Sequence, residues 1–231
     1  MTTEPNTANA SMAALTKGAA ARYPDHVAAR FRRGDEWVEI TYAALWDEVR
    51  AVAHGLIGLG VEPGDRVAIL CNTRYEFSVV DLAASTAGAV VVPVYPSNSP
   101  VECEWVIGDS GARIVVCEDE QQVAKVEQVR AALPALEHVV LIDGESAGTT
   151  GLDALRAAGE DGDDAGLVGR IDAVRPEDPC LIIYTSGTTG RPKGVVLTNQ
   201  GFAAGRASAV EMELFGAGDC LLYTSDAADE L

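Results

Sequence analysis

The sequence predicts an α/β fold in which layered, mostly parallel sheets are flanked by helices. Residues 66–71 and 89–94 are short apolar runs of the kind that forms strands buried on both faces of a parallel sheet. Residues 42–59 keep the apolar period of a helix, and residues 75–87 indicate a second helix rich in small residues. Strands and helices that alternate in this way form parallel sheets joined by right-handed crossovers.

Turn and cap signals place the other elements. Arg33-Gly34-Asp35 is typical of a hairpin, and Thr41 and Ser99 are suitable N-cap residues. We therefore expect helices at residues 11–22, 42–59, 75–87, 100–109, 120–133, 152–158 and 199–213. We expect strands at residues 27–32, 36–41, 66–71, 89–94, 113–117, 138–142, 180–184 and 195–198.

Residues 143–178 break this pattern. Glycine recurs throughout the segment together with Asp and Glu, and one short helix, at residues 152–158, is all the regular structure that we expect within it. The acidic string Asp161-Gly162-Asp163-Asp164 lacks the Asp-x-Asp-x-Asp-Gly spacing and the closing glutamate of a calcium loop. We therefore predict that residues 143–178 form a solvated, acidic, glycine-rich connector.

The charge balance disfavours two classes of partner. The 231 residues include 35 acidic and 17 basic side chains, which give a formal net charge of −18. Such a chain is unsuited to nucleic acid, whose phosphates select Lys and Arg, and to an anionic membrane surface. We expect no nucleic-acid partner, and we attribute the charge to solubility.

Cysteine usage and the first residues bear on location. Five widely spaced cysteines without a Cys-x-x-Cys pair disfavour a zinc site and indicate small core residues. Residues 1–10 are polar, which predicts a disordered leader rather than a secretory signal. No apolar run reaches membrane-spanning length. These observations predict a cytoplasmic protein, and peripheral contact with a membrane stays open.

One loop concentrates the chemistry: Tyr184-Thr185-Ser186-Gly187-Thr188-Thr189-Gly190-Arg191-Pro192-Lys193-Gly194. Its glycines let backbone N–H groups approach a ligand, its hydroxyls add donors and Lys193 adds a positive charge, which together suit a phosphate group. The spacing is not that of a Walker A loop, because Lys193 follows Pro192 and no helix is expected there. It also lacks the Gly-x-Gly-x-x-Gly of a dinucleotide loop. The alternative is a plain Gly/Thr-rich hairpin connection.

The whole string resembles the phosphate-binding signature of the adenylate-forming superfamily of AMP-binding enzymes. That superfamily includes acyl-CoA synthetases, adenylation domains of peptide synthetases, and luciferases. The tyrosine, the Thr-Ser-Gly-Thr-Thr-Gly core, the Pro-Lys-Gly and the apolar strand that follows all agree. Earlier strings are also similar to acyl-CoA synthetases: Tyr23-Pro24-Asp25, the helix entry Thr41-Tyr42, Gly64-Asp65-Arg66-Val67-Ala68-Ile69 and Gly88-Ala89-Val90-Val91-Val92-Pro93-Val94-Tyr95-Pro96. The last of these, together with Glu104-Trp105 and Asp109-Ser110-Gly111-Ala112, most resembles long-chain fatty acid–CoA ligases.

The resemblance implies a two-step reaction with ATP, Mg²⁺ and coenzyme A. A fatty carboxylate attacks the α-phosphorus of ATP, giving acyl-adenylate and pyrophosphate, and the thiol of coenzyme A then displaces AMP. The implied contacts with the β- and γ-phosphates come from the hydroxyls of Thr185, Ser186, Thr188 and Thr189, the backbone at Gly187 and Gly190, and the charge of Lys193. Thr185 is also the candidate Mg²⁺ ligand. None of these residues is implied to be a nucleophile or a general base.

The resemblance also predicts the domain organisation. Residues 11–220 correspond to part of an N-terminal AMP-binding domain. The family's C-terminal domain, and its adenine, acyl and coenzyme A contacts, have no counterpart in the sequence. Residues 221–231 are polar and unlike the family, and we expect them to be a non-native tail. We therefore expect the chain to be inactive by itself.

Three alternatives stay open. Within the superfamily, the enzyme can be one that activates an aryl acid or an amino acid. From a different class, the chain can be a non-catalytic phosphate- or nucleotide-binding module, which would bind ATP tightly by itself. It can also be a non-functional truncation product, which would aggregate or be degraded on expression.

Overall fold

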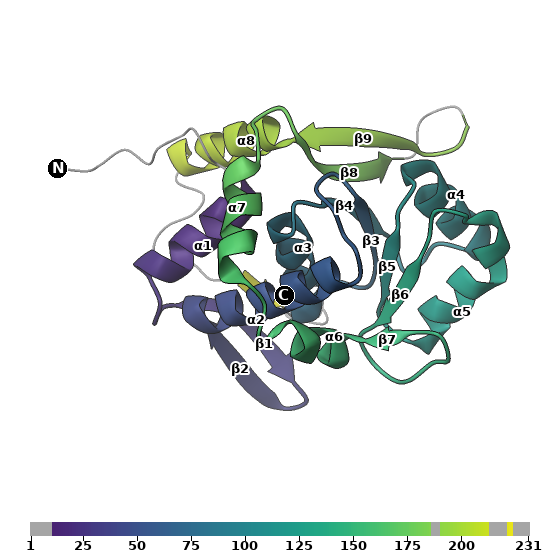
Figure 1. Cartoon of the computed structure of the whole chain (residues 1–231), viewed down its shortest axis with the longest axis horizontal. Coiled ribbons are helices and arrows are strands. Elements are labelled where there is room, and N and C mark those ends of the chain that lie inside the picture. The colour runs from purple at the N-terminus through teal and green to yellow at the C-terminus, as the bar shows by residue number, and fades with distance from the viewer. Residues whose placement is uncertain (1–10, 186–189, 213–220, 224–231) are drawn as a thin grey trace.

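Two β-sheets and the helices around them make up the described part of the chain (Figure 1). The computed structural model describes residues 11–185, 190–212 and 221–223. The helices are α1 (Met12–Arg22), α2 (Tyr42–Gly58), α3 (Tyr75–Thr86), α4 (Pro100–Ser110), α5 (Glu120–Val129) with a 3₁₀ turn at Arg130–Ala132, α6 (Leu152–Gly159), α7 (Asp164–Ala173) and α8 (Asn199–Glu211). The strands are β1 (Val27–Arg33), β2 (Glu36–Thr41), β3 (Arg66–Leu70), β4 (Val90–Val94), β5 (Ile114–Cys117), β6 (His138–Leu141), β7 (Thr150–Gly151), β8 (Pro179–Thr185), β9 (Lys193–Thr198) and β10 (Leu221–Tyr223).

The larger sheet has seven strands in the order β7-β6-β5-β3-β4-β8-β9. At its centre, Val67 of β3 pairs with Val91 of β4 on one side and with Ile114 of β5 on the other, both in parallel. β6 and β7 continue the parallel arrangement, and β8 joins β4 in parallel where Leu181 meets Val91. β9 then returns antiparallel to β8. The prediction of an α/β fold with mostly parallel strands and flanking helices is therefore confirmed.

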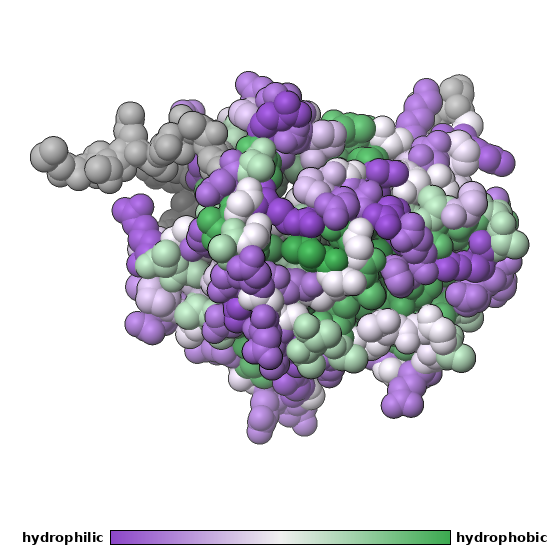
Figure 2. All heavy atoms as spheres, viewed as in Figure 1, coloured by the Kyte–Doolittle hydropathy of each residue, from purple (hydrophilic) through white to green (hydrophobic). Residues whose placement is uncertain are grey.

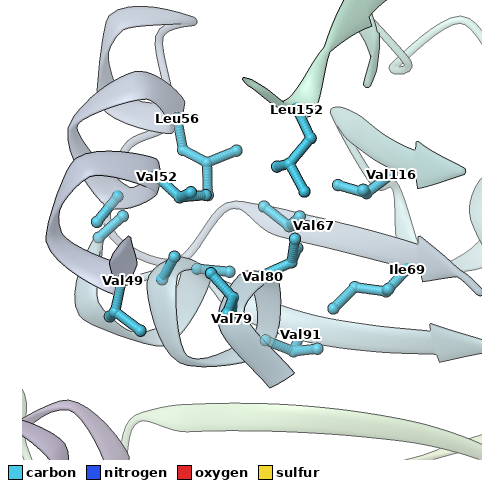
Figure 3. Packing of buried hydrophobic residues seen from close by; sticks show 14 of the residues in the cluster. Val49, Val52, Leu56, Val67, Ile69, Val79, Val80, Val91, Val116 and Leu152 are labelled. Carbon is cyan, nitrogen blue, oxygen red and sulfur yellow. The ribbon is translucent and has the colours of Figure 1, made fainter. Parts of the chain in front are cut away.

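Helices cover both faces of this sheet and bury its central strands. Along β3, Val67 and Ile69 belong to the apolar cluster that includes α2 and α3, while Ala68 and Leu70 belong to the cluster that includes α4 and α5. These four side chains are 0% exposed. Figure 3 shows the first cluster, in which Leu56 of α2 points toward the sheet. Burial on both faces explains why the strand sequences are continuously apolar rather than alternating.

The smaller sheet is built on the hairpin of β1 and β2. Arg33 pairs with Glu36, which confirms the predicted turn at Arg33-Gly34-Asp35. Gly34 has a φ of +62°, a conformation that glycine adopts without steric cost. β10 pairs in parallel with β1, with Leu221 opposite Ala29. β10 lies within residues 221–231, whose non-native origin stays a prediction.

The segment 143–178 contains more regular structure than its composition predicts. The expected short helix is present as α6, but the expectation of irregular chain around it is wrong, because α7 follows. Asp163 caps α7 by accepting hydrogen bonds from the backbone N–H groups of the second and third residues after it. Leu167 and Ile171 bury one side of the helix. Two glycines within α7, poor helix formers, obscure this short helical period in the sequence.

Glycine in this segment permits close packing. Gly159, the last residue of α6, lies against α2, where an added Cβ would be 1.9 Å from the carbonyl oxygen of Ala51. Gly55 of α2 in turn faces the backbone of α6, where an added Cβ would be 2.4 Å from the carbonyl oxygen of Leu155. The two helices can therefore approach to backbone contact, which any larger residue at these positions would prevent.

The cysteines mostly occupy the core. Cys71, Cys103 and Cys117 are buried, as predicted for small core residues, and Cys180 is half-buried. All of these are free thiols. Cys220 lies outside the described residues. Among the described helices, none combines the length and apolar character that crossing a bilayer requires.

Candidate phosphate-binding site

The loop predicted to bind phosphate joins β8 to β9 (Figure 1). β8 runs parallel to β4, so the loop leaves the sheet at the carboxyl edge of the parallel strands. The segments after β3 and β4 leave at the same edge. Ligands of open α/β sheets bind in the crevice outside this edge, so the loop is placed where the fold class favours a binding site.

Thr185 and Lys193 lie directly opposite each other at the base of the loop, as a pair in the β8–β9 ladder. Residues opposite each other in antiparallel strands project to the same face, with Cβ atoms about 5 Å apart. Both residues are exposed, as is Gly190, whose φ of +108° suits glycine. The other predicted phosphate contacts lie outside the described residues: Ser186, Gly187, Thr188 and Thr189. The structure thus brings a hydroxyl group and an ammonium group within reach of one ligand.

Tyr184, which directly precedes Thr185, is fixed by α4. Its hydroxyl donates a hydrogen bond to Oδ2 of Asp109 over 2.6 Å, and the residue is 8% exposed. Burial raises the pKa of the Tyr184 phenol, and the hydrogen bond to Asp109 and the charge of that carboxylate raise it further. Tyr184 therefore stays a neutral donor that anchors β8 at the start of the loop.

Trp105 of α4 contacts the chain where it returns from the loop. Its indole Nε1–H donates to the carbonyl oxygen of Pro192 over 2.8 Å. The guanidinium of Arg191 lies over the same ring, with 4.7 Å between Cζ and the ring centroid, which is a cation–π contact. These two contacts attach the residues directly before Lys193 to α4.

The roles of Trp105 and Asp109 are not predicted from the sequence. Both occur in strings that resemble acyl-CoA synthetases, but nothing in those strings assigns them a contact with the loop. Their spacing of four residues on a predicted helix is the available signal, because it places them on one face. It does not show what that face meets, since the contacts span 75 and 87 residues of sequence.

α4 is itself held by a cap at each end. Ser99 and Glu102 form a capping box: the Ser99 backbone N–H donates to Glu102 Oε2 over 2.7 Å, and the Glu102 backbone N–H donates to Ser99 Oγ over 3.4 Å. Gly111 ends the helix in the left-handed conformation, with a φ of +64°. The predicted N-cap is confirmed. The hydrogen bonds from Ser99 also lower the pKa of Glu102, so the carboxylate form of the capping box is favoured.

A cavity of about 840 Å³ opens beside these contacts. Residues of α4, the segment after β4, residues 132–136 and the base of the loop form its walls. Tyr95, Trp105 and Tyr184 supply aromatic surface, and Thr185 and Arg191 come from the loop. Small-molecule sites commonly have volumes of about 300–1,000 Å³, so a ligand that contacts the loop has room beside it.

The charge around this cavity is mainly acidic. Glu102, Glu104 and Asp109 line it, against the single base Arg191 among the described lining residues. The net charge of −18 adds a general repulsion for anions. Because Arg191 is stacked on Trp105, Lys193 is the cation at the base of the loop that is best placed to attract phosphate.

Apolar side chains are exposed on the hairpin that carries the loop. Val195 and Val196 of β9 are 48% and 55% exposed. Figure 2 shows hydrophilic residues over much of the visible face, with apolar residues at the surface along the β8–β9 hairpin at the top. The hairpin therefore presents an apolar surface next to a polar loop.

Known proteins share sequence with this chain. The model of the family described as AMP-binding enzyme matches residues 16–228. The long-chain fatty acid–CoA ligase FadD15 of Mycobacterium bovis is 42% identical over 175 residues, which are 76% of this chain and 29% of that relative. The chain thus spans less than a third of the length of the curated relatives it matches.

Solved structures share its fold. The apo structure of MbtA from Mycobacterium smegmatis superposes with a TM-score of 0.81 at 24% identity, covering 96% of this chain and 45% of that one. A fatty acyl CoA synthetase of Mycobacterium tuberculosis has a TM-score of 0.68 at 26% identity, covering 82% of this chain and 34% of that one. At these identities, the first likeness concerns the fold alone.

Proposed function

The chain belongs to the AMP-binding enzyme family, and from this premise we propose that it is the N-terminal part of an ATP-dependent long-chain fatty acid–CoA ligase. The observation that carries the proposal is the pairing of Thr185 and Lys193 across the base of the loop, within the family's phosphate-binding signature. The 42% identity to the ligase FadD15 supports a long-chain fatty acid as the carboxylate substrate.

The proposed reaction activates a fatty acid in two steps. A carboxylate oxygen attacks the α-phosphorus of ATP, which forms an acyl-adenylate and releases pyrophosphate. The sulfur of coenzyme A then attacks the acyl carbonyl carbon, the thiol proton is lost, and AMP leaves. The first step converts a poor acylating agent into one with a good leaving group. Enzymes accelerate such steps mainly by positioning the reactants and stabilising charge.

The loop residues bind and orient the triphosphate. The ammonium group of Lys193, beside the hydroxyl of Thr185, offsets the charge of the β- and γ-phosphates. The remaining contacts that we propose are hydroxyl donors at Ser186, Thr188 and Thr189 and backbone N–H groups at Gly187 and Gly190. In this proposal no loop residue acts as a nucleophile or a general base.

Mg²⁺ fits this site as a partner of the nucleotide rather than as a resident ion. The described residues include no group of His, Cys, Asp and Glu side chains that could hold a metal ion by itself. Thr185 offers an exposed hydroxyl oxygen, and Mg²⁺ is commonly held by one or two protein oxygens together with water and substrate phosphates. Thr185 is therefore its proposed protein ligand. The bound ion would reduce the negative charge of the phosphates.

The free thiols of Cys71, Cys103, Cys117 and Cys180 are typical of a reducing compartment, which supports a location in the cytoplasm. The long-chain fatty acid favours peripheral contact with a membrane. An aryl acid or an amino acid is the alternative carboxylate, and a non-catalytic nucleotide-binding module is the alternative class of protein.

ATP–pyrophosphate exchange tests the proposal in the complete enzyme, expressed from the gene that encodes this chain. Palmitate, an aryl acid and a panel of amino acids are each supplied with ATP, Mg²⁺ and labelled pyrophosphate. We expect exchange driven by palmitate, lowered in Lys193→Ala and unchanged in Lys17→Ala, a lysine of α1. If an aryl acid or an amino acid drives exchange and palmitate does not, that compound class would replace the long-chain fatty acid as the proposed substrate. Tight ATP binding by the 231-residue chain alone would favour the binding module.

A further inference from the structure

One face of α4 contacts the chain on both sides of the phosphate-binding loop. Asp109 accepts the hydrogen bond of Tyr184, which precedes the loop on β8. Trp105, one helical turn earlier, donates to Pro192, which directly precedes β9. Two contacts from a single helix face therefore define where the loop begins and where it ends.

We propose that Trp105 and Asp109 form a bracket for the loop, and that Trp105 is a positioning residue for Lys193. The inference rests on the proposed function of the loop as a phosphate site. It adds a residue outside the loop signature, on a helix far away in sequence, whose task is to orient the loop's cation.

The hydrogen bond of Trp105 acts on the peptide unit that contains the Lys193 nitrogen. The carbonyl of Pro192 and the N–H of Lys193 belong to one planar group. When Trp105 holds the Pro192 carbonyl at 2.8 Å, it also sets the orientation of that plane and hence the direction in which the chain enters Lys193. A shift of this plane would turn the Lys193 side chain away from Thr185.

The stacked guanidinium adds a second fixed point. Arg191 lies over the Trp105 ring at 4.7 Å, which holds its side chain against α4. The indole thus engages two consecutive residues, one through its ring face and one through its N–H. Lys193 is left as the cation opposite Thr185.

Fixing Arg191 and Pro192 lowers the cost of binding a ligand at Lys193. Residues that are already held in place in the folded protein lose less conformational entropy when a ligand binds than free residues do. Loss of the bracket should therefore weaken ATP binding while leaving the bound state, and so the rate of its reaction, nearly unchanged.

Trp105→Phe removes the indole N–H and part of the ring surface, and it keeps an aromatic face for Arg191. Trp37→Phe is a matched control. Trp37, on β2, also carries a stacked arginine, with Arg30 Cζ at 5.0 Å from its ring centroid, and it belongs to the smaller sheet. Melting temperature and near-UV circular dichroism of both variants show whether the fold is kept.

The first arm measures the loop in the 231-residue chain by amide hydrogen exchange. In Trp105→Phe we expect the amide exchange rates of Lys193 and Gly194 to rise about fivefold, because the net stabilisation of about one hydrogen bond is lost. The exchange rates in β3 should stay unchanged. Trp37→Phe should leave Lys193 and Gly194 unchanged. Unaltered exchange at Lys193 and Gly194 in a folded Trp105→Phe protein would contradict the proposal that Trp105 holds the loop, whatever ligand the loop binds. Should that variant not fold, Tyr184→Phe removes the other contact and should raise exchange at Thr185.

The second arm measures the complete enzyme. Trp105→Phe should raise the KM for ATP about fivefold and leave kcat within about twofold, which separates positioning from loss of folded enzyme. An unchanged KM for ATP, together with a raised KM in Lys193→Ala, would overturn the positioning role and leave the proposed function standing. Equal kinetics of Lys193→Ala and wild type would instead contradict the phosphate site itself, and with it the role of Trp105 toward ATP.

Discussion

Thr185 and Lys193 form the last residue pair of the β8–β9 ladder, and one carries a hydroxyl group and the other an ammonium group. They are separated by seven residues of loop in the sequence, and the antiparallel register brings them back to one place. A ligand at the base of the loop therefore meets a hydrogen-bond donor and a positive charge together, in a chain whose net charge is otherwise strongly negative.

Removal of the Lys193 charge should weaken ATP binding to the 231-residue chain. We expect weak binding of Mg-ATP, reduced about tenfold in Lys193→Ala, which corresponds to about 1.4 kcal/mol. Added salt should weaken binding by wild type more than by the variant, because screening acts on the charge that the variant lacks. ³¹P NMR titration at two salt concentrations measures both effects. Lys17→Ala is the control, and equal affinities for wild type and Lys193→Ala would contradict the assignment.

The Tyr184–Asp109 hydrogen bond should give stability that declines at alkaline pH. The pKa of Tyr184 is raised in the fold, so above about pH 10 the unfolded chain loses this proton while the folded chain keeps it. The free energy of unfolding should therefore fall as pH rises through this range. Urea unfolding from pH 8 to pH 11 measures the slope.

Tyr184→Phe is the matched variant for that measurement. It should lower the free energy of unfolding at neutral pH by about 1–2 kcal/mol, since the hydrogen bond to the Asp109 carboxylate is lost. The free energy of unfolding of the variant should also decline less steeply with pH above about pH 10, because the titrating phenol is gone. An identical pH slope in the two proteins would show that another group causes the decline.

The close contact of α6 with α2 makes Gly159 intolerant of a side chain. In Gly159→Ala the new methyl group would meet the carbonyl oxygen of Ala51, which belongs to helix backbone and cannot rotate away. We expect a loss of about 1–3 kcal/mol in the free energy of unfolding. Gly169→Ala is the contrasting variant, because a Cβ there meets nothing within 4 Å and alanine favours the helix. It should gain about 0.5–1 kcal/mol. Equal effects at the two positions would contradict this packing.

The N-cap of α7 should be measurable by a single substitution. Asp163 accepts from the backbone N–H groups of Ala165 and Gly166. Asp163→Ala should therefore lower the free energy of unfolding by about 1 kcal/mol. Asp161→Ala, an exposed residue of the same acidic string, should change it by less than about 0.5 kcal/mol. Chemical denaturation of both variants checks this, and similar losses would argue against the cap.

The central part of the fold is predictable because its strands are buried on both faces. Val67 and Ile69 serve one cluster and Ala68 and Leu70 the other, so the sequence of β3 is continuously apolar and recognisable. α7 is not predictable in the same way. Its glycines lower the helical propensity, and the cap and the buried Leu167 decide the outcome through tertiary packing.

The candidate site likewise has a part that is predictable from the local sequence and a part that is not. The residues at the base of the loop are recognisable locally, because the whole string from Tyr184 to Gly194 resembles the phosphate-binding signature of the adenylate-forming superfamily. The contacts that hold the loop are not local. Trp105 and Asp109 carry no signal of their own, and only the fold shows that their face of α4 meets Tyr184 and Pro192.

The attachment of the hairpin to the sheet has a mechanical consequence. β3 pairs with β4 along its whole length, from Arg66 to Leu70, whereas the described ladder between β4 and β8 consists of the pair Val91 and Leu181. The β8–β9 hairpin thus shares a shorter ladder with its neighbour than the central strands share, and it carries the loop at the end beyond that pair. Near the loop, Ile182 and Tyr184 of β8 pack in the apolar cluster between the sheet and α4, so side chains of α4 contribute to the stiffness of the hairpin there. Substitutions on α4 can therefore change how firmly the end of the hairpin is held, while the buried strands of the sheet keep their packing.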